Sequence, residues 1–447
     1  MTVFRITAAV AALIILVSVP SGANAGESVS LYDAWKLTLS NSESVLIAGE
    51  EAFQDRLDKH RAYSRILPSV TLSGNYTKYS EDKYSASGVL LQPEDTTRYE
   101  ARVEQTIFGG GKEFSAIRQA GFLSKGSKAM HEDAKEDAIV KGSRAFYNLL
   151  ASMRELDIRK SSLKRAEDLL TLSKKRFEVG SATKADVLRA EAEAAAKRAD
   201  VVVADGAHVN AVSYFERLTA LKGEYTLVPQ MPGLVEWFKT VEDNADKLIL
   251  TALEKRRDYK QLEYLERAAS SGVGYARGQF LPTVSLEGVY VKRDQTPLPT
   301  EYIDEYVYGG INVKFPIFEG GLRVAELRQA KSKFREASLM RVSARRDIEL
   351  DVRRKLNDMK SAMALVDSYE KALAFAKENY EVVLKQYRYG LADNIGLVEA
   401  ETTLVGAELG FSRASLSYEL SVIELKRSIG VLFDEVTVRL KLPVSER

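Results

Sequence analysis

Arg176-Phe-Glu-Val-Gly-Ser-Ala-Thr-Lys-Ala-Asp-Val-Leu-Arg-Ala-Glu191 is the stretch that decides the fold. It places Gly180 between two long helical patterns and follows it with Thr183. Glycine readily takes the left-handed conformation that ends a helix, and a threonine hydroxyl can cap the helix that comes next. Tyr387-Arg-Tyr-Gly-Leu-Ala-Asp-Asn-Ile-Gly-Leu-Val-Glu-Ala-Glu401 repeats this arrangement, with Gly390 lying 210 residues after Gly180. A return at a fixed spacing indicates that the chain is a duplication.

Other segments repeat in the same order. Leu281-Pro-Thr-Val-Ser-Leu-Glu-Gly288 matches Leu67-Pro-Ser-Val-Thr-Leu-Ser-Gly74 at a spacing of 214, and Phe315-Pro-Ile-Phe-Glu-Gly-Gly321 matches the segment ending at Gly111 at a spacing of 210. The difference of four residues falls in a loop, where insertions cost little free energy. The repeated segments therefore support the duplication.

Each repeat contains two runs in which apolar and polar residues alternate. In the first run, Val70, Leu72, Gly74 and Tyr76 fall on one face, with polar residues between them. This period of two predicts a strand with one apolar face. The polar stretch 80–97 is expected to be the loop of the first hairpin.

Unusually long helical patterns follow the hairpins. Residues 112–177 contain no proline, and leucines recur every seven residues at Leu149, Leu156, Leu163 and Leu170. This spacing predicts a rod of about 100 Å that pairs with other helices in a left-handed coiled coil. Each repeat thus reads as a helix, a β-hairpin, a long helix, a turn at the tip and a returning helix.

These patterns give the expected division of the chain. The first repeat spans 26–235, with a hairpin at about 68–108 and long helices at about 112–222. The second repeat spans 236–447, with a hairpin at about 282–318 and long helices at about 322–430.

Residues 1–25 are expected to be a secretory signal peptide. They contain one basic residue, an apolar run and Ala-Asn-Ala at the end, which is a typical cleavage site. A membrane anchor is the alternative, but the apolar run is shorter than the ~20 residues that a spanning helix needs. The chain has no cysteine, so it contains neither a disulfide nor a lipidated cysteine. Its 64 basic and 63 acidic residues argue against a nucleic-acid partner.

Four strands with one apolar face are too few to close a barrel. In an exported chain, unclosed apolar strands suggest that several copies pool their strands in an outer membrane. The tyrosines expected to form an aromatic girdle at the membrane surface are Tyr76, Tyr79, Tyr99, Tyr290, Tyr306 and Tyr308. The alternative is an exported periplasmic coiled-coil structural protein or adhesin without pore activity.

The duplicated Leu-Pro-x-Val segment, the Phe-x-Gly-Gly turn and the Val-Gly-Ser-Ala-Thr-Lys-Ala-Asp-Val-Leu tip resemble the TolC-type outer-membrane efflux channels. The resemblance covers essentially the whole mature chain. It implies an α+β membrane protein that forms a homotrimer, with a 12-stranded β-barrel in the outer membrane of a Gram-negative bacterium joined to an α-helical barrel in the periplasm. It also implies passive conduction in a tripartite efflux or type I secretion system, with a periplasmic adaptor and an inner-membrane pump as partners.

The resemblance also assigns candidate site residues. The tips that would contact the adaptor are Val179, Gly180, Ser181, Ala182, Thr183, Gly390, Leu391 and Ala392. Asp186, Tyr387 and Glu399 match the places where the family holds its periplasmic mouth closed or narrow. Gly396 stands where the family has a second acidic residue, and Ala392 stands where it has a basic one. These departures predict a wider, less acidic and more weakly held mouth.

An enzyme is the contrasting class. The three histidines, His60, His131 and His208, lie far apart in sequence, and without cysteine they suggest no metal site. The chain also has no Gly-x-Ser-x-Gly or phosphate-binding motif. We therefore expect no catalytic residue and no cofactor, and the energy for transport would come from a partner.

Overall fold

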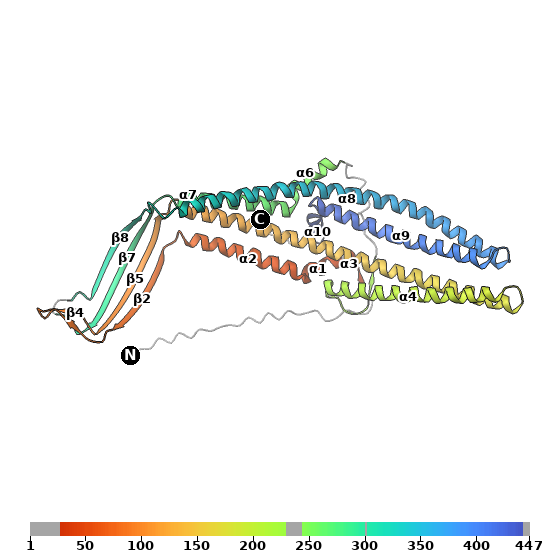
Figure 1. Cartoon of the computed structure of the whole chain (residues 1–447), viewed down its shortest axis with the longest axis horizontal. Coiled ribbons are helices and arrows are strands. Elements are labelled where there is room, and N and C mark those ends of the chain that lie inside the picture. Colours follow the sequence, from red (N-terminus) through yellow and green to blue (C-terminus); the bar gives the residue numbers. More distant parts are fainter. Residues whose placement is uncertain (1–26, 229–243, 300–301, 441–447) are drawn as a thin grey trace.

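The computed structural model describes residues 27–228, 244–299 and 302–440. The molecule is elongated, with a β-sheet at one end and two helical hairpins at the other (Figure 1). The predicted signal peptide, 1–25, and the expected boundary between the repeats at 235 and 236 lie outside the described residues.

The two halves of the chain share the order of two helices, a hairpin, a long helix and a returning helix, and differ in their short elements. The first comprises β1 (Glu27–Val29), α1 (Leu31–Asn41), α2 (Glu43–Ser64), β2 (Ser69–Lys78), β3 (Lys83–Tyr84), β4 (Leu90–Gln92), β5 (Asp95–Phe108), α3 (Lys112–Glu178), α4 (Lys184–Thr219) and β6 (Tyr225–Leu227). The second comprises α6 (Ala245–Lys255), α7 (Arg257–Gly278), β7 (Thr283–Thr296), β8 (Glu305–Lys314), α8 (Leu322–Arg388), α9 (Asn394–Ser428) and α10 (Leu432–Leu440). The long helices α3 and α8 both have 67 residues.

Local details add to the expected plan and correct one part of it. The first helical segment is split at Ser42, whose extended backbone separates α1 from α2. The expected loop 80–97 contains the short strands β3 and β4, and β5 already begins at Asp95. The connection between the repeats contains β6, which pairs in parallel with β1. Strands of two or three residues are too short to show periodicity in the sequence.

The two hairpins form a single four-stranded sheet in the order β2-β5-β7-β8. Neighbouring strands are antiparallel, and residues directly opposite each other share a face. Leu72, Ala101, Tyr290 and Val307 lie in one such row, so most apolar residues of the four strands gather on one face, with Val289 and Val291 of β7 as exceptions.

The register corrects the predicted aromatic girdle. Tyr308 lies opposite Val289, which lies opposite Arg102, and Tyr306 lies opposite Val291 in the next row of the same face. The two tyrosines therefore belong to the polar face, where Arg293 donates a hydrogen bond to the Tyr306 hydroxyl at 3.2 Å. They flank Val307, and alternation along β8 assigns Val307, but neither tyrosine, to the apolar face.

Glycines turn the sheet into the long helices. Gly110 and Gly111, which precede α3, have φ angles of 71° and 78°, in the left-handed region. A Cβ atom at Gly110 would lie 2.3 Å from the carbonyl oxygen of Gly278, at the end of α7. Only glycine fits this crossing, which brings α3 and α7 together just below the sheet.

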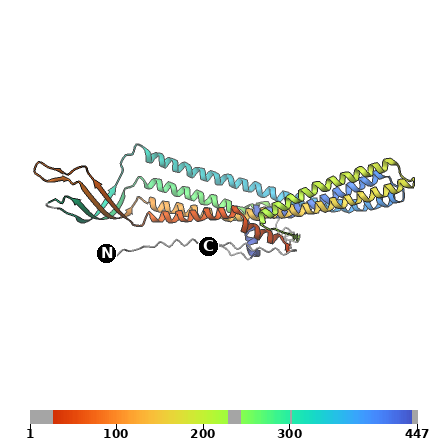
Figure 2. The same ribbon diagram turned by 90° about the horizontal axis from the view of Figure 1, so that it is seen from below.

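Helices pair along the length of the molecule. Figure 2 shows α2, α3, α7 and α8 running from the sheet toward the middle, and α4 and α9 returning alongside α3 and α8. Along the predicted seam of α3, Leu149 and Leu156 are buried, and Met359 and Tyr387 are buried along the seam of α8. None of the described helices is long and apolar enough to cross a membrane.

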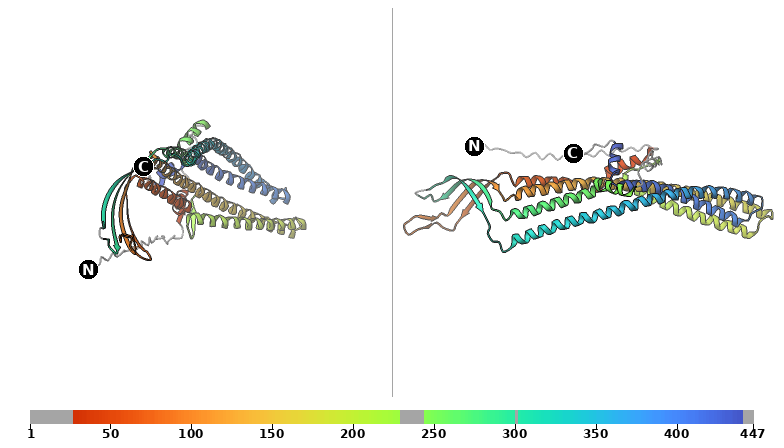
Figure 3. Two further views of the ribbon diagram at one scale, coloured as in Figure 1. Left: turned by 60° about the vertical axis from the view of Figure 1, so that its left-hand side comes forward. Right: turned by 90° about the horizontal axis from the view of Figure 1, so that it is seen from above.

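The main core lies at a waist, where the short elements pack on the long helices (Figure 3). Trp35, Phe146 and Phe215 are fully or almost fully buried there, and the Trp35 indole donates a 2.7 Å hydrogen bond to Ser143. We call α1, α6, α10, β1 and β6 the waist elements.

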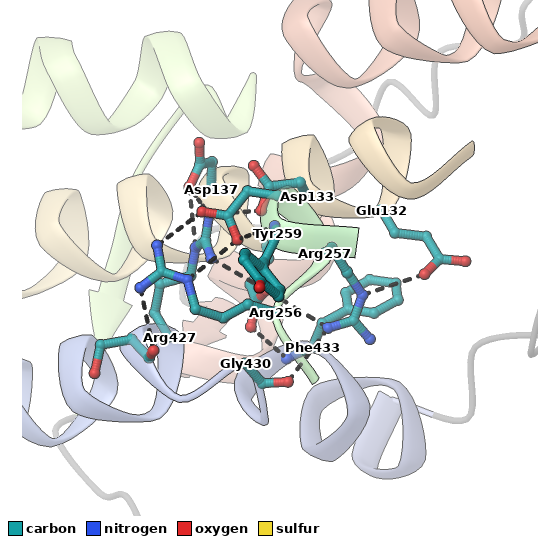
Figure 4. A network of polar contacts seen from close by, with 12 residues as sticks. Glu132, Asp133, Asp137, Arg256, Arg257, Tyr259, Arg427, Gly430 and Phe433 are labelled. Carbon is teal, nitrogen blue, oxygen red and sulfur yellow. Dashed lines mark hydrogen bonds and ion pairs between the residues drawn. The ribbon is translucent and has the colours of Figure 1, made fainter. Parts of the chain in front are cut away.

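A network of charged side chains ties α3, α7, α9 and α10 together at the waist (Figure 4). Arg427 donates to Asp133 at 2.7 Å and to Asp137 at 3.0 Å, while Arg257 lies over the ring of Phe433 at 4.8 Å. Glu136 is completely buried among these groups and accepts a hydrogen bond from the backbone of Phe433.

Candidate functional site

The first tip is built by helix-capping interactions. Gly180, with a φ of 77°, follows the end of α3, and the Ser181 amide closes the turn on the carbonyl oxygen of Arg176 at 2.8 Å. Thr183 and Asp186 then form a reciprocal capping box at the start of α4. The tip conformation thus follows from its own sequence.

The second tip repeats this geometry with a different cap. Gly390 has a φ of 78°, and the Leu391 amide donates to the carbonyl oxygen of Gln386 at 2.8 Å. Asp393 caps α9 by accepting a 2.9 Å hydrogen bond from the amide of Gly396. Gly396 therefore lies in the first turn of α9 and carries no side chain that could narrow a passage.

The tips expose apolar side chains. Val179 is 77% exposed and Leu391 79% exposed, whereas Ala182 and Ala392 are half-buried. Tyr389 is 82% exposed and was not selected from the sequence, although it directly precedes the tip glycine. Exposed apolar groups gathered at one end of a molecule are typical of a contact surface.

Tyr387 joins the two helical hairpins. Its side chain is buried, and its hydroxyl lies 3.2 Å from the hydroxyl of Ser173 on α3. Arg176 lies over the Tyr387 ring at 4.9 Å and donates to its backbone carbonyl oxygen at 3.0 Å. The sequence provided no basic partner after the second tip glycine, and the structure provides one from the first hairpin instead. Arg176 thus gives Tyr387 a basic contact within the chain, and the weak tether of the assembled mouth stays a prediction.

The Asp186 carboxylate takes part in capping α4 at the first tip. The Thr183 hydroxyl and backbone amide both donate to its carboxylate, at 2.7 Å and 2.9 Å, and these hydrogen bonds lower the pKa of Asp186. Its backbone carbonyl oxygen accepts a hydrogen bond from the Asn394 side chain at 3.1 Å, which links the two tips. In the described residues, the carboxylate makes no hydrogen bond to Tyr387.

Glu399 points away from the paired helices. It is exposed on α9, and within the described ranges its carboxylate has neither an ion pair nor a hydrogen bond. Two residues further along, about 200° around the helix, Glu401 is buried against α3. The carboxylate of Glu401 accepts hydrogen bonds from Ser162 at 2.9 Å and from Arg165 at 2.9 Å.

The Arg165–Glu401 pair was missed by sequence reasoning. Glu401 continues the repeat of Glu191, but periodicity alone does not identify its partner 236 residues away. Arg165 also lies 5.9 Å from the ring centroid of Tyr380, and a cavity of about 300 Å³ adjoins the pair between α3, α8 and α9. The two helical hairpins thus meet at a partly polar junction on the sheet side of their tips.

No group of His, Cys, Asp or Glu side chains in the described part of the chain is arranged to hold a metal ion. The Nδ1 atom of His208 lies 3.2 Å from the hydroxyl of Ser152, and the His131 ring adjoins Gly49 at the contact between α2 and α3. His131 and His208 therefore lie in separate contacts, and His60 is exposed.

Residues 46–223 and 248–431 match the sequence profile of the family described as outer membrane efflux protein. The chain belongs to the outer membrane efflux protein family. The match covers most of both repeats, and this family is the one that the sequence motifs predicted.

Relatives and solved structures agree with this family. The outer membrane protein TolC of Escherichia coli is 24% identical over 87% of this chain and 79% of its own length. The alkaline protease secretion protein AprF of Pseudomonas aeruginosa is 22% identical over 92% of this chain and 86% of its own length. The Campylobacter jejuni outer membrane channel CmeC has a TM-score of 0.80 at 18% identity, covering 92% of this chain and 89% of that one. The predicted fold class is confirmed.

Proposed function

We propose that three copies of this efflux-family chain form the outer-membrane conduit of a tripartite efflux or type I secretion system. The conduit passively carries substrates from a periplasmic adaptor and an inner-membrane pump to the exterior. The sheet carries this proposal, because it has one apolar face and its outer strands, β2 and β8, each pair with only one described strand. Three four-stranded sheets closed edge to edge give twelve strands, with the apolar face toward outer-membrane lipid.

The names of the relatives support both kinds of system. One relative is named an alkaline protease secretion protein, and another, from Pseudomonas putida, a probable efflux pump outer membrane protein. Both names describe transport, and we infer that this chain likewise catalyses no reaction. The duplication into 26–235 and 236–447 belongs to the same proposal, with each repeat supplying one hairpin and one coiled coil.

Conductance in planar bilayers tests the conduit. The mature protein, purified in detergent, should migrate as a trimer and produce discrete ion-conducting channels. A monomer that stays soluble without detergent and forms no channels would instead support the periplasmic rod or adhesin.

We propose that the tips contact the adaptor through Val179, Gly180, Ser181, Ala182 and Thr183 and through Gly390, Leu391 and Ala392. Ala182→Asp and Leu391→Asp should abolish export while leaving the trimer intact, because an unpaired charge buried in a contact costs several kcal/mol. Survival on an exported toxic compound, in a strain lacking its own copy of the channel, measures export.

Leu250→Asp is the matched control for the tip variants, since Leu250 is 67% exposed on α6 at the waist. It should leave export unchanged. Export that survives both tip substitutions would show that the adaptor binds elsewhere.

We further propose that the periplasmic mouth lies at the same end, with Asp186 and Tyr387 restraining it and Glu399 facing the passage. The exposure of Glu399 supports this, as does the pairing of Tyr387 with the first hairpin. Because Gly396 adds no side chain, we expect a higher resting conductance than a doubly acidic mouth would give.

A further inference from the structure

A groove of about 340 Å³ lies between α3 and α7, at the point where α10 meets them. Lysines and an arginine from three helices line it: Lys125, Lys128, Lys255, Arg257 and Lys260. We call this feature the basic groove. It contrasts with the nearly neutral charge of the whole chain.

The acidic side chains of the groove are already engaged. Arg257 pairs with both Glu132 and Asp434, the two carboxylates that line it. In the described part of the chain, the ammonium groups of Lys125, Lys255 and Lys260 make no ion pair. Like charges gathered in this way repel one another modestly, and a bound anion would relieve that repulsion.

The backbone adds to the positive potential. The N-terminus of α7 opens at the groove, because Arg257 is the first residue of that 22-residue helix. The unpaired amides and the dipole at a helix N-terminus favour negative charge. The groove therefore combines lysine ammonium groups with the positive end of α7, where Asp258 already accepts a hydrogen bond from the Tyr259 amide.

In the proposed assembly, the order of the elements leaves the groove open. Across the layer the helices contact one another in the order α2, α3, α7 and α8, as the strands do in the order β2, β5, β7 and β8. Further copies would join at the outer elements, and α3 and α7 are the inner ones. Asp434 of α10 lines the groove, so it opens beside the waist elements. Those elements would obstruct the conduit if they faced its interior.

We propose that the basic groove binds a carboxylate-bearing polymer of the periplasm, namely the peptide stems of the cell wall. The orientation rests on the proposed function, in which the sheet lies in the outer membrane. Lys125 and Glu132 lie 13 and 20 residues into α3, about 20–30 Å from the sheet. The phosphates of outer-membrane lipids do not reach this depth, whereas a polymer lying in the periplasm does.

Co-sedimentation with purified cell-wall sacculi tests this assignment. The detergent-purified trimer should sediment with sacculi, and added polyglutamate or salt should release it. Lys125→Gln combined with Lys260→Gln should weaken binding about tenfold, because two charged contacts are lost. Lys164→Gln combined with Lys377→Gln is the matched control, since both lysines are exposed on the lower coiled coils. This control should bind as the wild type does.

Several outcomes would overturn the proposal. One is that the wild-type trimer does not sediment with sacculi. Another is that the groove variant binds as strongly as the wild type. A third is that the control variant loses as much binding as the groove variant does. Stronger binding to vesicles containing anionic phospholipid would assign the groove to lipid phosphates instead. Channel conductance of the groove variant should match that of the wild type, which separates a failed groove from a failed conduit.

Discussion

At the scale of single residues, the contacts of Tyr387 and Glu399 distinguish a structural role from an electrostatic one. The Tyr387 side chain is buried and touches Ser173 and Arg176, so it holds the two hairpins of one chain together. Glu399 is exposed and touches no charged partner in the described ranges. A free carboxylate near the end of a conduit acts through its charge, and that role is measured by ion selectivity.

Glu399→Gln should reduce the preference of the channel for cations. In the proposed trimer, three copies of this carboxylate ring the passage, attracting cations and repelling anions. Reversal potentials in a salt gradient measure the change. Glu254→Gln removes the same charge from an exposed position on α6 and should leave selectivity unaltered. An unchanged preference in Glu399→Gln would place the constriction elsewhere.

Glu136 predicts a pH dependence of stability at the waist. Burial raises the pKa of this carboxyl group to about 7, although Arg427 and Arg257 oppose the shift. Because the pKa is higher in the folded state, the folded protein binds the proton more tightly than the unfolded chain does. This contribution to stability is present below the ordinary pKa and is lost as the pH rises through about 7.

The Glu136→Gln variant should therefore remove part of the decrease in thermal stability between pH 6 and pH 8. Glutamine stays neutral throughout that range and keeps the acceptor for the Phe433 amide. Circular dichroism melts of both proteins in detergent measure the difference. If the melting temperature changes between pH 6 and pH 8 by the same amount in the wild type and in Glu136→Gln, the two guanidinium groups keep Glu136 ionised.

At the scale of elements, each tip folds by local rules while the pairing of the hairpins depends on distant contacts. The tip glycines, Thr183 and Asp393 terminate and cap the helices within a few residues. Arg165, Ser162 and Glu401 instead join α3 to α9 through a largely buried ion pair. Removing one partner of such a pair lowers the stability of the fold, because the remaining charge loses its nearest opposite charge.

Glu401→Gln should lower the free energy of unfolding by about 1–3 kcal/mol, because it leaves Arg165 with only its longer contact to Glu408, at 3.5 Å. Denaturant melts of the trimer in detergent, read by circular dichroism, measure the loss. Arg413→Gln is the control, since Arg413 also joins α9 to α3, through Glu155, but its side chain is 64% exposed. It should cost less than about 1 kcal/mol. Equal losses in both variants would mean that burial of the pair contributes nothing.

At the scale of the whole molecule, a single chain is incomplete. Leu72, Val70 and Ile311 are 80%, 73% and 69% exposed on the apolar face of the sheet, and the sheet has two open edges. A lone sheet of this kind would expose unpaired backbone groups and apolar surface to water. Assembly with further copies in a membrane removes both costs, which is why the conduit is proposed for a trimer.

The sequence alone determined the repeats, the strand periodicity, the seven-residue helix seams and both tips, because these depend on residues close together in the chain. Gly180, Gly390 and the Thr183–Asp186 capping box could be read locally for that reason. Only the tertiary structure decided that Arg176 reaches Tyr387, that Arg165 meets Glu401 and that Tyr306 and Tyr308 lie opposite Val291 and Val289. Those features depend on helix contacts and strand register between segments distant in sequence, and hydrophobic periodicity carries no information about which distant polar groups meet.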